Sequence, residues 1–260
     1  MVKAVIIVSF GTASLEGVKE LENFEDNIKK ELHGKYNIFK AFTSGSMSNI
    51  LFNKYGKVVP RLEEVLYKLS NERYKEVYIQ PLHIIEGSEY SYINKILKEY
   101  NYTFSKIRVG NVLMGENEEM FLNGSKIIYE ALNKNFKSKT SNILLIGHGS
   151  KAINDDKYKK IQDKFIEEGF KNTYIGTLEG ENLKEDILEI LLENKIEELY
   201  LVPILMLPGK HIVKDIFGTN DSWKSLLENN NIKVNSIEKS LLQYDEIREY
   251  YLNNICKDLK

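Results

Sequence analysis

Short apolar runs alternate along this chain with longer segments in which apolar residues recur every three or four positions. Residues 2–11 are almost entirely apolar and predict a strand buried on both faces. In the segment from Leu15 to Leu32 the apolar spacing is that of an amphipathic helix, and Gly34 follows as a stop signal. Repetition of this unit predicts a parallel sheet covered by helices.

The same pattern predicts four strands in each half of the chain. They lie at residues 2–11, 36–43, 76–81 and 107–114, and at residues 142–146, 173–177, 198–204 and 232–236. Helices are predicted over residues 15–32, 60–69 (opened by Pro60), 121–132, 187–191 and 244–259, and a small polar loop over residues 44–46. The predicted fold class is α/β, with similar parallel-sheet domains at residues 1–127 and 128–260 and the terminal helix packing back on the first.

The two halves also match at the ends of their strands. VSFGT (residues 8–12) aligns with IGHGS (146–150), and FTSG (42–45) aligns with TLEG (177–180). YIQPLHIIEGSEY (78–90) aligns with YLVPILMLPGKHI (200–212), with proline and glycine in register. This match indicates an internal duplication, and we expect a cleft between the copies.

Three aligned positions differ in a way that matters chemically. The alignment pairs Phe10 with His148, Ser44 with Glu179, and Glu89 with His211. Two imidazoles and a carboxylate are a suitable donor set for cobalt, nickel, iron or zinc, and they leave coordination sites open for a substrate. The second half is therefore expected to hold a metal, with Glu89 of the first half facing it.

Each of these residues has an ordinary interpretation when taken alone. A histidine between glycines at a strand end, such as His148, serves equally well to cap a helix or bind a phosphate. Glu179 alone is typical of a solvated loop, with Glu181 as a substitute, and His211 alone is typical of an exposed loop. Their occurrence at equivalent strand ends is what favours a shared site.

Composition and charge narrow the function classes. The chain has 260 residues and a formal net charge of −2, so neither nucleic acid nor an anionic membrane is an expected partner. The apolar start is too short for a signal peptide, and the single Cys256 excludes an internal disulfide, which predicts a cytoplasmic protein. Nucleotide-binding glycine motifs and the GxSxG serine motif are absent. His83 aligns with an apolar residue and is expected to pack or to support the site.

Four motifs together resemble a known family: IGHGS with His148, GTLEG with Glu179, PLHIIEGSEY with Glu89, and MLPGKHIVKDI with His211. Over essentially the whole length, the chain is similar to the single-chain, two-domain anaerobic cobalt chelatases (sirohydrochlorin cobaltochelatases) of the class II chelatase superfamily. The resemblance implies insertion of Co(II), as substrate metal and without an organic cofactor, into sirohydrochlorin or precorrin-2 on the oxygen-independent route to cobalamin. It also implies two α/β domains with the tetrapyrrole between them.

By the same resemblance, His148 and His211 would be catalytic, metal-binding residues, Glu179 a third metal ligand, and Glu89 a catalytic acid across the cleft. Sirohydrochlorin carries many carboxylates, so cations and hydroxyls are expected around it. The residues expected to contact substrate are Ser9, Thr12, Ser88 and Lys210, with Lys151, Lys214, Ser14 and Ser46 as further candidates. Some relatives carry a leader peptide, and none is recognised here, which again favours the cytoplasm.

Several alternatives stay open at this point. Metallation requires removal of two pyrrole protons, which a neutral imidazole is able to accept once it releases the ion. The ligands do not encode the metal, so an iron or nickel chelatase acting on a related tetrapyrrole is an alternative. A non-catalytic metal or haem carrier is another, and so is a two-lobed binding protein whose histidines are incidental. The sequence also leaves a homo-oligomer open.

Overall fold

The computed structural model describes residues 3–149 and 156–259, and its internal contacts divide the chain into two compact units. One unit comprises Met1–Phe121 and Arg248–Lys260, and the other comprises Leu122–Ile247. Ser150 of the GHGS motif and Lys151 lie outside the described residues. The domain boundary expected from the sequence, after residue 127, stays a prediction.

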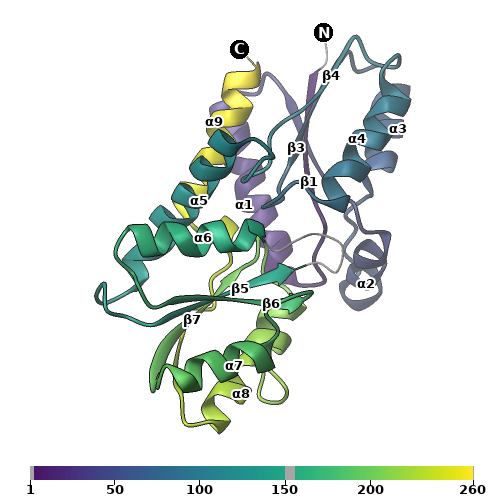
Figure 1. Cartoon of the computed structure of the whole chain (residues 1–260). Coiled ribbons are helices and arrows are strands. Elements are labelled where there is room, and N and C mark those ends of the chain that lie inside the picture. Colours follow the sequence, from purple (N-terminus) through teal and green to yellow (C-terminus); the bar gives the residue numbers. More distant parts are fainter. Residues whose placement is uncertain (1–2, 150–155, 260) are drawn as a thin grey trace. The chain divides into compact units, whose positions relative to one another are not determined.

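The first unit is a four-stranded parallel sheet in the order β2-β1-β3-β4 (Figure 1). Its strands are β1 (Lys3–Ser9), β2 (Asn37–Phe42), β3 (Glu76–Pro81) and β4 (Lys106–Val109). Its helices are α1 (Leu15–Glu31), α2 (Gly45–Tyr55), α3 (Leu62–Asn71) and α4 (Ser88–Tyr100), while α5 (Glu118–Leu132) and α9 (Asp245–Leu259) each contain a point of division. In Figure 1, α1 lies on one side of the sheet and α3 and α4 on the other.

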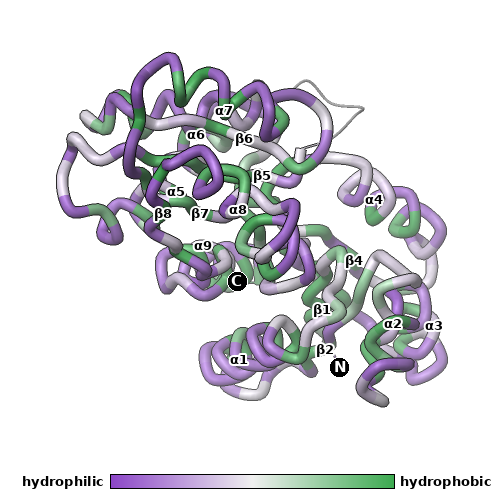
Figure 2. Tube along the Cα trace, turned by 90° about the horizontal axis from the view of Figure 1, so that it is seen from below, coloured by the Kyte–Doolittle hydropathy of each residue, from purple (hydrophilic) through white to green (hydrophobic). Residues whose placement is uncertain are grey.

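Strand β1 lies inside the sheet, between β2 and β3, and is almost completely buried. Its residues from Ala4 to Val8 are at most 1% exposed, as expected for a strand covered by helices on both faces. Ala4, Ile6 and Val8 pack into one apolar cluster with the apolar stripe of α3. Each fully buried aliphatic side chain contributes about 1.5–3 kcal/mol. In Figure 2, α1 is mostly hydrophilic, and its hydrophobic residues recur three or four positions apart on the side that is buried.

The second unit repeats this architecture with the strand order β6-β5-β7-β8. Its strands are β5 (Ile143–Gly149), β6 (Thr173–Glu179), β7 (Glu198–Ile204) and β8 (Lys233–Ser236). Its helices are α6 (Asp156–Glu167), α7 (Lys184–Glu193), the π-helix η2 (His211–Ile216) and α8 (Trp223–Asn229), with short 3₁₀ turns η1 (Asn133–Asn135) and η3 (Leu241–Gln243). In Figure 1, α6 lies on one face of the sheet and α7 and α8 lie on the other.

Strand register supports the duplication residue by residue. In the first unit Val8 pairs with Ala41 and with Pro81. In the second unit the aligned Ile146 pairs with Gly176 and with Pro203, which are the aligned partners. The predicted fold class, two similar parallel-sheet α/β halves, is confirmed.

Two local predictions were wrong. Residues 44–46 are not a loop, because Ser44 Oγ accepts a hydrogen bond from Met47 N (3.3 Å) and α2 begins at Gly45. The strand predicted over residues 107–114 ends at Val109, because the chain then turns to follow the segment after β3. There Leu113 N donates to the His83 carbonyl (3.0 Å).

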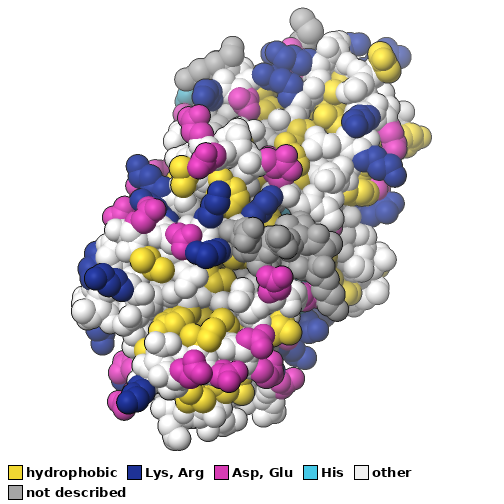
Figure 3. All heavy atoms as spheres, in the orientation of Figure 1, with side chains coloured by type: hydrophobic (Ala, Val, Ile, Leu, Met, Phe, Trp, Pro, Cys, Tyr) yellow, Lys and Arg dark blue, Asp and Glu magenta, His cyan; other side chains and the backbone are white. Residues whose placement is uncertain are grey.

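The surface carries interspersed charges of both signs. On the face shown in Figure 3, Lys and Arg side chains lie among Asp and Glu side chains. Many of them form pairs one helical turn apart, such as Lys159 with Asp163 (2.9 Å) and Lys164 with Glu168 (2.8 Å). Among the described residues, no helix combines the length and the apolar character needed to cross a membrane.

A buried polar network ties the end of α9 to β3 within the first unit. The Tyr78 hydroxyl donates to Asp258 Oδ2 (2.7 Å), and Gln80 Nε2 donates to the Asn111 carbonyl (2.8 Å). Burial is the larger cause, and the neighbouring Asp258 carboxylate the second, of a pKa of Tyr78 well above its usual range. Tyr251 adds a bond from its hydroxyl to the His83 carbonyl (2.8 Å).

The His83 side chain follows β3 and is unusual in its environment. The residue as a whole is half-buried, but both ring nitrogens are shielded from solvent, and neither has a hydrogen-bond partner among the described residues. Because the charge would sit on these nitrogens, burial lowers the pKa of His83 from 6.5 to about 4. The ring is therefore a neutral packing group in the folded protein.

Replacing His83 with Leu is expected to weaken the acid sensitivity of the fold. As the pH falls from about 6.5 to about 4, His83 is protonated in the unfolded chain but stays neutral in the folded protein. The free energy of unfolding of the wild type therefore decreases by about 2–3 kcal/mol over this range. His83→Leu lacks this loss. Urea unfolding at pH 7.5 and 4.5 measures the difference, with the exposed His33→Asn as control. Equal pH dependence in wild type and His83→Leu would contradict the assignment.

Candidate functional site

His148 is carried by the exposed end of β5. Residues 143–147 are buried, and His148 and Gly149 emerge half-buried beyond them. Gly149 has a φ of +74°, and a Cβ at this position would lie 1.8 Å from the Glu179 carbonyl oxygen. Only glycine therefore allows the backbones of β5 and β6 to approach this closely beside His148.

His211 is carried by the π-helix that follows β7. Ile212 and Ile216 of this helix are buried in the same apolar cluster as Leu144 and Ile146 of β5. The buried side anchors the helix and leaves His211 half-exposed. Single turns of π-helix are frequent at functional sites.

The two imidazole rings meet at the end of the sheet. Their centroids are 5.0 Å apart and their planes make an angle of 86°. Two imidazoles bound to one ion through nitrogens about 2.0–2.1 Å away, at a near-tetrahedral angle, have centroids roughly 5 Å apart. The observed separation thus suits a shared metal ion.

Hydrogen bonds favour the same tautomer in both rings. His148 Nδ1 lies 3.2 Å from the Gly149 carbonyl oxygen, and His211 Nδ1 lies 2.6 Å from Asp215 Oδ2. A carbonyl and a carboxylate only accept hydrogen bonds, so each Nδ1 is the donor. In both rings the lone pair of Nε2 is left for a ligand or a proton.

Glu179 is the last residue of β6 and pairs in register with Gly149. Its side chain is exposed, and the following turn is closed by hydrogen bonds from Thr177 Oγ1 to the Glu181 carbonyl and from Thr177 N to the Asn182 carbonyl. Within the described residues, no three His, Cys, Asp or Glu side chains lie close enough together to hold an ion. The structure brings the two histidines together, and Glu179 as third ligand stays a prediction.

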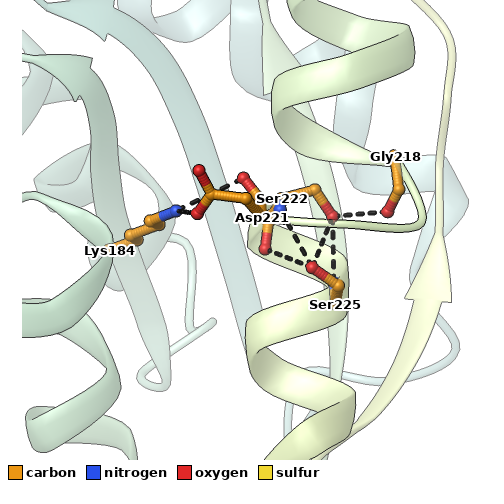
Figure 4. Close-up of polar contacts among 5 residues, drawn as sticks. All are labelled: Lys184, Gly218, Asp221, Ser222 and Ser225. Carbon is orange, nitrogen blue, oxygen red and sulfur yellow. Dashed lines mark hydrogen bonds and ion pairs between the residues drawn. The ribbon is translucent and has the colours of Figure 1, made fainter.

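A polar network holds the loop after the π-helix (Figure 4). Ser222 Oγ donates to the Gly218 carbonyl (2.6 Å) and accepts from Ser225 N (3.0 Å), which fixes the start of α8. Lys184, the first residue of α7, forms an ion pair with Asp221. The segments that carry Glu179 and His211 are therefore joined beyond the site, although the Asp221 side chain is 90% exposed and such a pair adds little stability.

Glu89 occupies the first turn of α4 in the first unit. Thr43 Oγ1 donates a hydrogen bond to Glu89 Oε2, and the Thr43 backbone N donates to the Ser9 carbonyl (2.9 Å). The ends of β1 and β2 thus fix one oxygen of this carboxylate. Its predicted placement across a cleft stays a prediction.

The residues expected to contact substrate carboxylates differ in exposure. Ser88 and Lys210 are exposed. Ser9 and Thr12 are only 2% and 3% exposed, and Thr12 Oγ1 accepts from Ser14 N (3.1 Å) in the turn before α1. Of the four, Ser88 and Lys210 have the exposure that a contact with a substrate carboxylate requires.

Sequence reasoning missed Asp215 and Thr43. Asp215 lies four residues after His211, which is the spacing of neighbours on one face of a helix. The spacing indicates a contact only if a helix is predicted directly after Pro208 and Gly209, and none was predicted there. Thr43 gave no signal, because its contact with Glu89 joins residues 46 positions apart.

Comparison with known proteins identifies the family. The sequence profile of the family described as "Cobalt chelatase (CbiK)" matches residues 3–260. The chain belongs to the CbiK cobalt chelatase family. This confirms the predicted family resemblance and, with it, the predicted enzyme class, a metal chelatase.

Two proteins named as sirohydrochlorin cobaltochelatases are similar in sequence to this CbiK-family chain. It is 24% identical over 256 residues to the sirohydrochlorin cobaltochelatase CbiKC of Nitratidesulfovibrio vulgaris, covering 97% of this chain and 89% of that protein. It is 25% identical over 228 residues to the sirohydrochlorin cobaltochelatase of Salmonella typhimurium, covering 86% of this chain and 84% of that protein.

Solved structures share the fold of this CbiK-family member. SirB from Bacillus subtilis with Fe³⁺ superposes with a TM-score of 0.66 at 16% identity, covering 99% of this chain and 95% of SirB. CbiX, described as the terminal enzyme of sirohaem biosynthesis in denitrifying bacteria, gives a TM-score of 0.61 at 12% identity, covering 99% and 100% of the two chains. At these identities the likeness concerns the fold.

Replacing Gly149 with Ala is expected to destabilise this CbiK-family chain by several kcal/mol, because the added Cβ meets the Glu179 backbone in addition to the cost of positive φ, about 1–2 kcal/mol. Gly34→Ala is a matched control, since Gly34 has a φ of +70° and no atom of the described residues lies within 4 Å of the added atom. Urea unfolding of both variants separates overlap from backbone strain. Equal losses would contradict the close approach.

Proposed function

We propose that this chain inserts Co(II) into sirohydrochlorin, or into precorrin-2, in anaerobic cobalamin biosynthesis. The observation that carries the proposal is the pairing of His148 and His211, with ring centroids 5.0 Å apart and with Nδ1 as the hydrogen-bond donor in both rings, which leaves the Nε2 lone pairs for a ligand. Membership of the cobalt chelatase family and the two named sirohydrochlorin cobaltochelatases support the substrate and the metal.

In this proposal the two Nε2 atoms hold the incoming Co(II), and the carboxylate of Glu179 is the third donor. Three protein donors leave the ion coordinatively unsaturated, so nitrogens of the macrocycle are able to bind before the protein ligands leave. Neutral imidazoles hold the ion moderately, which suits a metal that is substrate and must be released. The second unit supplies all three of these donors.

Proton removal is the second task of the same residues. Two pyrrole N–H protons leave as the ion enters the ring, and each Nε2 becomes a free acceptor when it gives up the ion. Because Nδ1 is already protonated in both rings, Nε2 is the only position that accepts a proton. Metal release and proton uptake are thereby coupled at one atom.

Glu89 has a separate role in the proposal. Its carboxylate, held by Thr43 at Oε2 in the first unit, is an alternative acceptor for one of the two pyrrole protons. Ser88 beside it and Lys210 beside His211 are exposed and bind peripheral carboxylates of the substrate. Cytoplasmic location, the lack of an organic cofactor and a homo-oligomer remain predictions from the sequence.

An iron chelatase on a related tetrapyrrole is the second candidate function. The SirB structures of the same fold are described with Fe³⁺ and with cobalt. Imidazole and carboxylate donors bind Fe(II), Co(II) and Ni(II) with affinities that follow the same Irving–Williams order at any such site. The donor set by itself therefore does not identify the physiological metal.

Replacing His148 or His211 with Ala is expected to lower the turnover of sirohydrochlorin metallation by at least about 100-fold, because each change removes a metal ligand and a proton acceptor. Absorbance of the macrocycle measures metallation with Co(II), Fe(II) and Ni(II) in turn, above the rate without protein. Binding of sirohydrochlorin is expected to persist. His33→Asn is the histidine control. Absence of multiple turnover in the wild type would instead indicate a carrier.

Thr43→Val is expected to lower kcat about 10-fold, since Glu89 loses the donor that orients it, whereas Glu89→Gln lowers kcat by about 100-fold by removing the base. A double-mutant cycle gives the decisive comparison. In the Glu89→Gln background, Thr43→Val should have little further effect on kcat. Independent, multiplicative losses would show that Thr43 does not act through Glu89.

A further inference from the structure

The partners of the two Nδ1 atoms are unequal. His148 donates to the carbonyl of the next residue, Gly149, at 3.2 Å. His211 donates to the carboxylate of Asp215 at 2.6 Å, a length typical of a strong, charge-assisted hydrogen bond. One histidine therefore has a weak neutral partner, and the other has a strong anionic one.

We propose that Asp215 is a positioning residue that holds His211 in the orientation and tautomer required to bind the substrate metal through Nε2. The inference rests on the proposed function, because it concerns the same metal site. Asp215 is proposed to affect metal binding indirectly, through its hydrogen bond to the ring of His211. Asp215 itself is not a ligand in this proposal.

The π-helix places His211 and Asp215 within contact distance of each other. His211 and Asp215 are its first and fifth residues, and the buried Ile212 and Ile216 hold the helix against the sheet. The backbone positions of His211 and Asp215 are thereby fixed relative to one another, which places the carboxylate within reach of the ring. Without this acceptor, the ring is free to rotate about χ2 and to exchange its proton between Nδ1 and Nε2, and only one of these tautomers leaves Nε2 open.

Exposure indicates that the pair contributes little to folding. The side chains of His211 and Asp215 are 45% and 39% exposed, and pairs of this kind add little to the stability of a protein. Loss of a carboxylate partner of a metal-binding histidine, in contrast, weakens metal binding by about 10–100-fold. The expected effect of Asp215 is therefore on metal affinity and not on the unfolding transition.

The test measures Co(II) affinity and the visible Co(II) absorption spectrum of the full-length protein. Asp215→Ala is expected to weaken Co(II) binding by about 10–100-fold and to change the spectrum, with an unfolding midpoint close to that of the wild type. Asp215→Asn keeps an oxygen acceptor without the charge, so it should recover part of the affinity. Asp163→Asn is the matched control, because Asp163 pairs with Lys159 at the same spacing on α6.

A second arm asks whether Asp215 acts through His211. In the His211→Ala background, Asp215→Ala should leave Co(II) affinity unchanged. Wild-type affinity and spectrum in both Asp215 variants would overturn the inference while leaving the proposed function intact. Additive losses in the double variant would overturn it as well. Failure of the wild type itself to bind Co(II) would remove the proposed function and, with it, the inference.

Discussion

The chemistry of this site depends on what each imidazole Nδ1 contacts. Because Gly149 and Asp215 accept hydrogen bonds from the Nδ1 atoms of His148 and His211, Nε2 is the one ring nitrogen left to bind the proposed metal or to accept a proton. The 5.0 Å separation of the rings then suits one shared ion, as the proposed function requires. In the proposed function, such a site holds the ion through two neutral donors of moderate strength and gains two proton acceptors when the ion leaves.

The backbone beneath the rings sets this geometry. Parallel strands end at the same edge of a sheet, so a duplicated β-α unit presents equivalent positions side by side in each copy. In the second copy the close approach of the Gly149 and Glu179 backbones is available only to glycine. The first copy has Phe10 at the position of His148, and Phe10 is 47% exposed. Duplication followed by divergence at strand ends thus accounts for one unit with paired histidines and one unit with Glu89.

Periodicity predicted most of the architecture, because strands covered on both faces and amphipathic helices leave strong apolar patterns. The strand predicted over residues 198–204 is β7 with the same bounds. Helix α2 was missed because it begins within a run of small polar residues, and only Leu51 of its apolar residues is buried. Alignment of the halves found His148 and His211 from local motifs, whereas Asp215 was missed because no helix was predicted over residues 211–216, so its spacing from His211 was not recognised as a contact.

Nitrogen NMR of the histidine side chains tests the central claim most directly. The chain has four histidines, so single His→Gln variants suffice to assign the signals in long-range ¹⁵N–¹H spectra. At a pH where the rings are neutral, His148 and His211 should both be Nδ1–H tautomers, and one equivalent of diamagnetic Zn²⁺ should shift the Nε2 signals of both rings together. An Nε2–H tautomer in either ring, or a Zn²⁺ response confined to one of them, would contradict a shared ion held through Nε2.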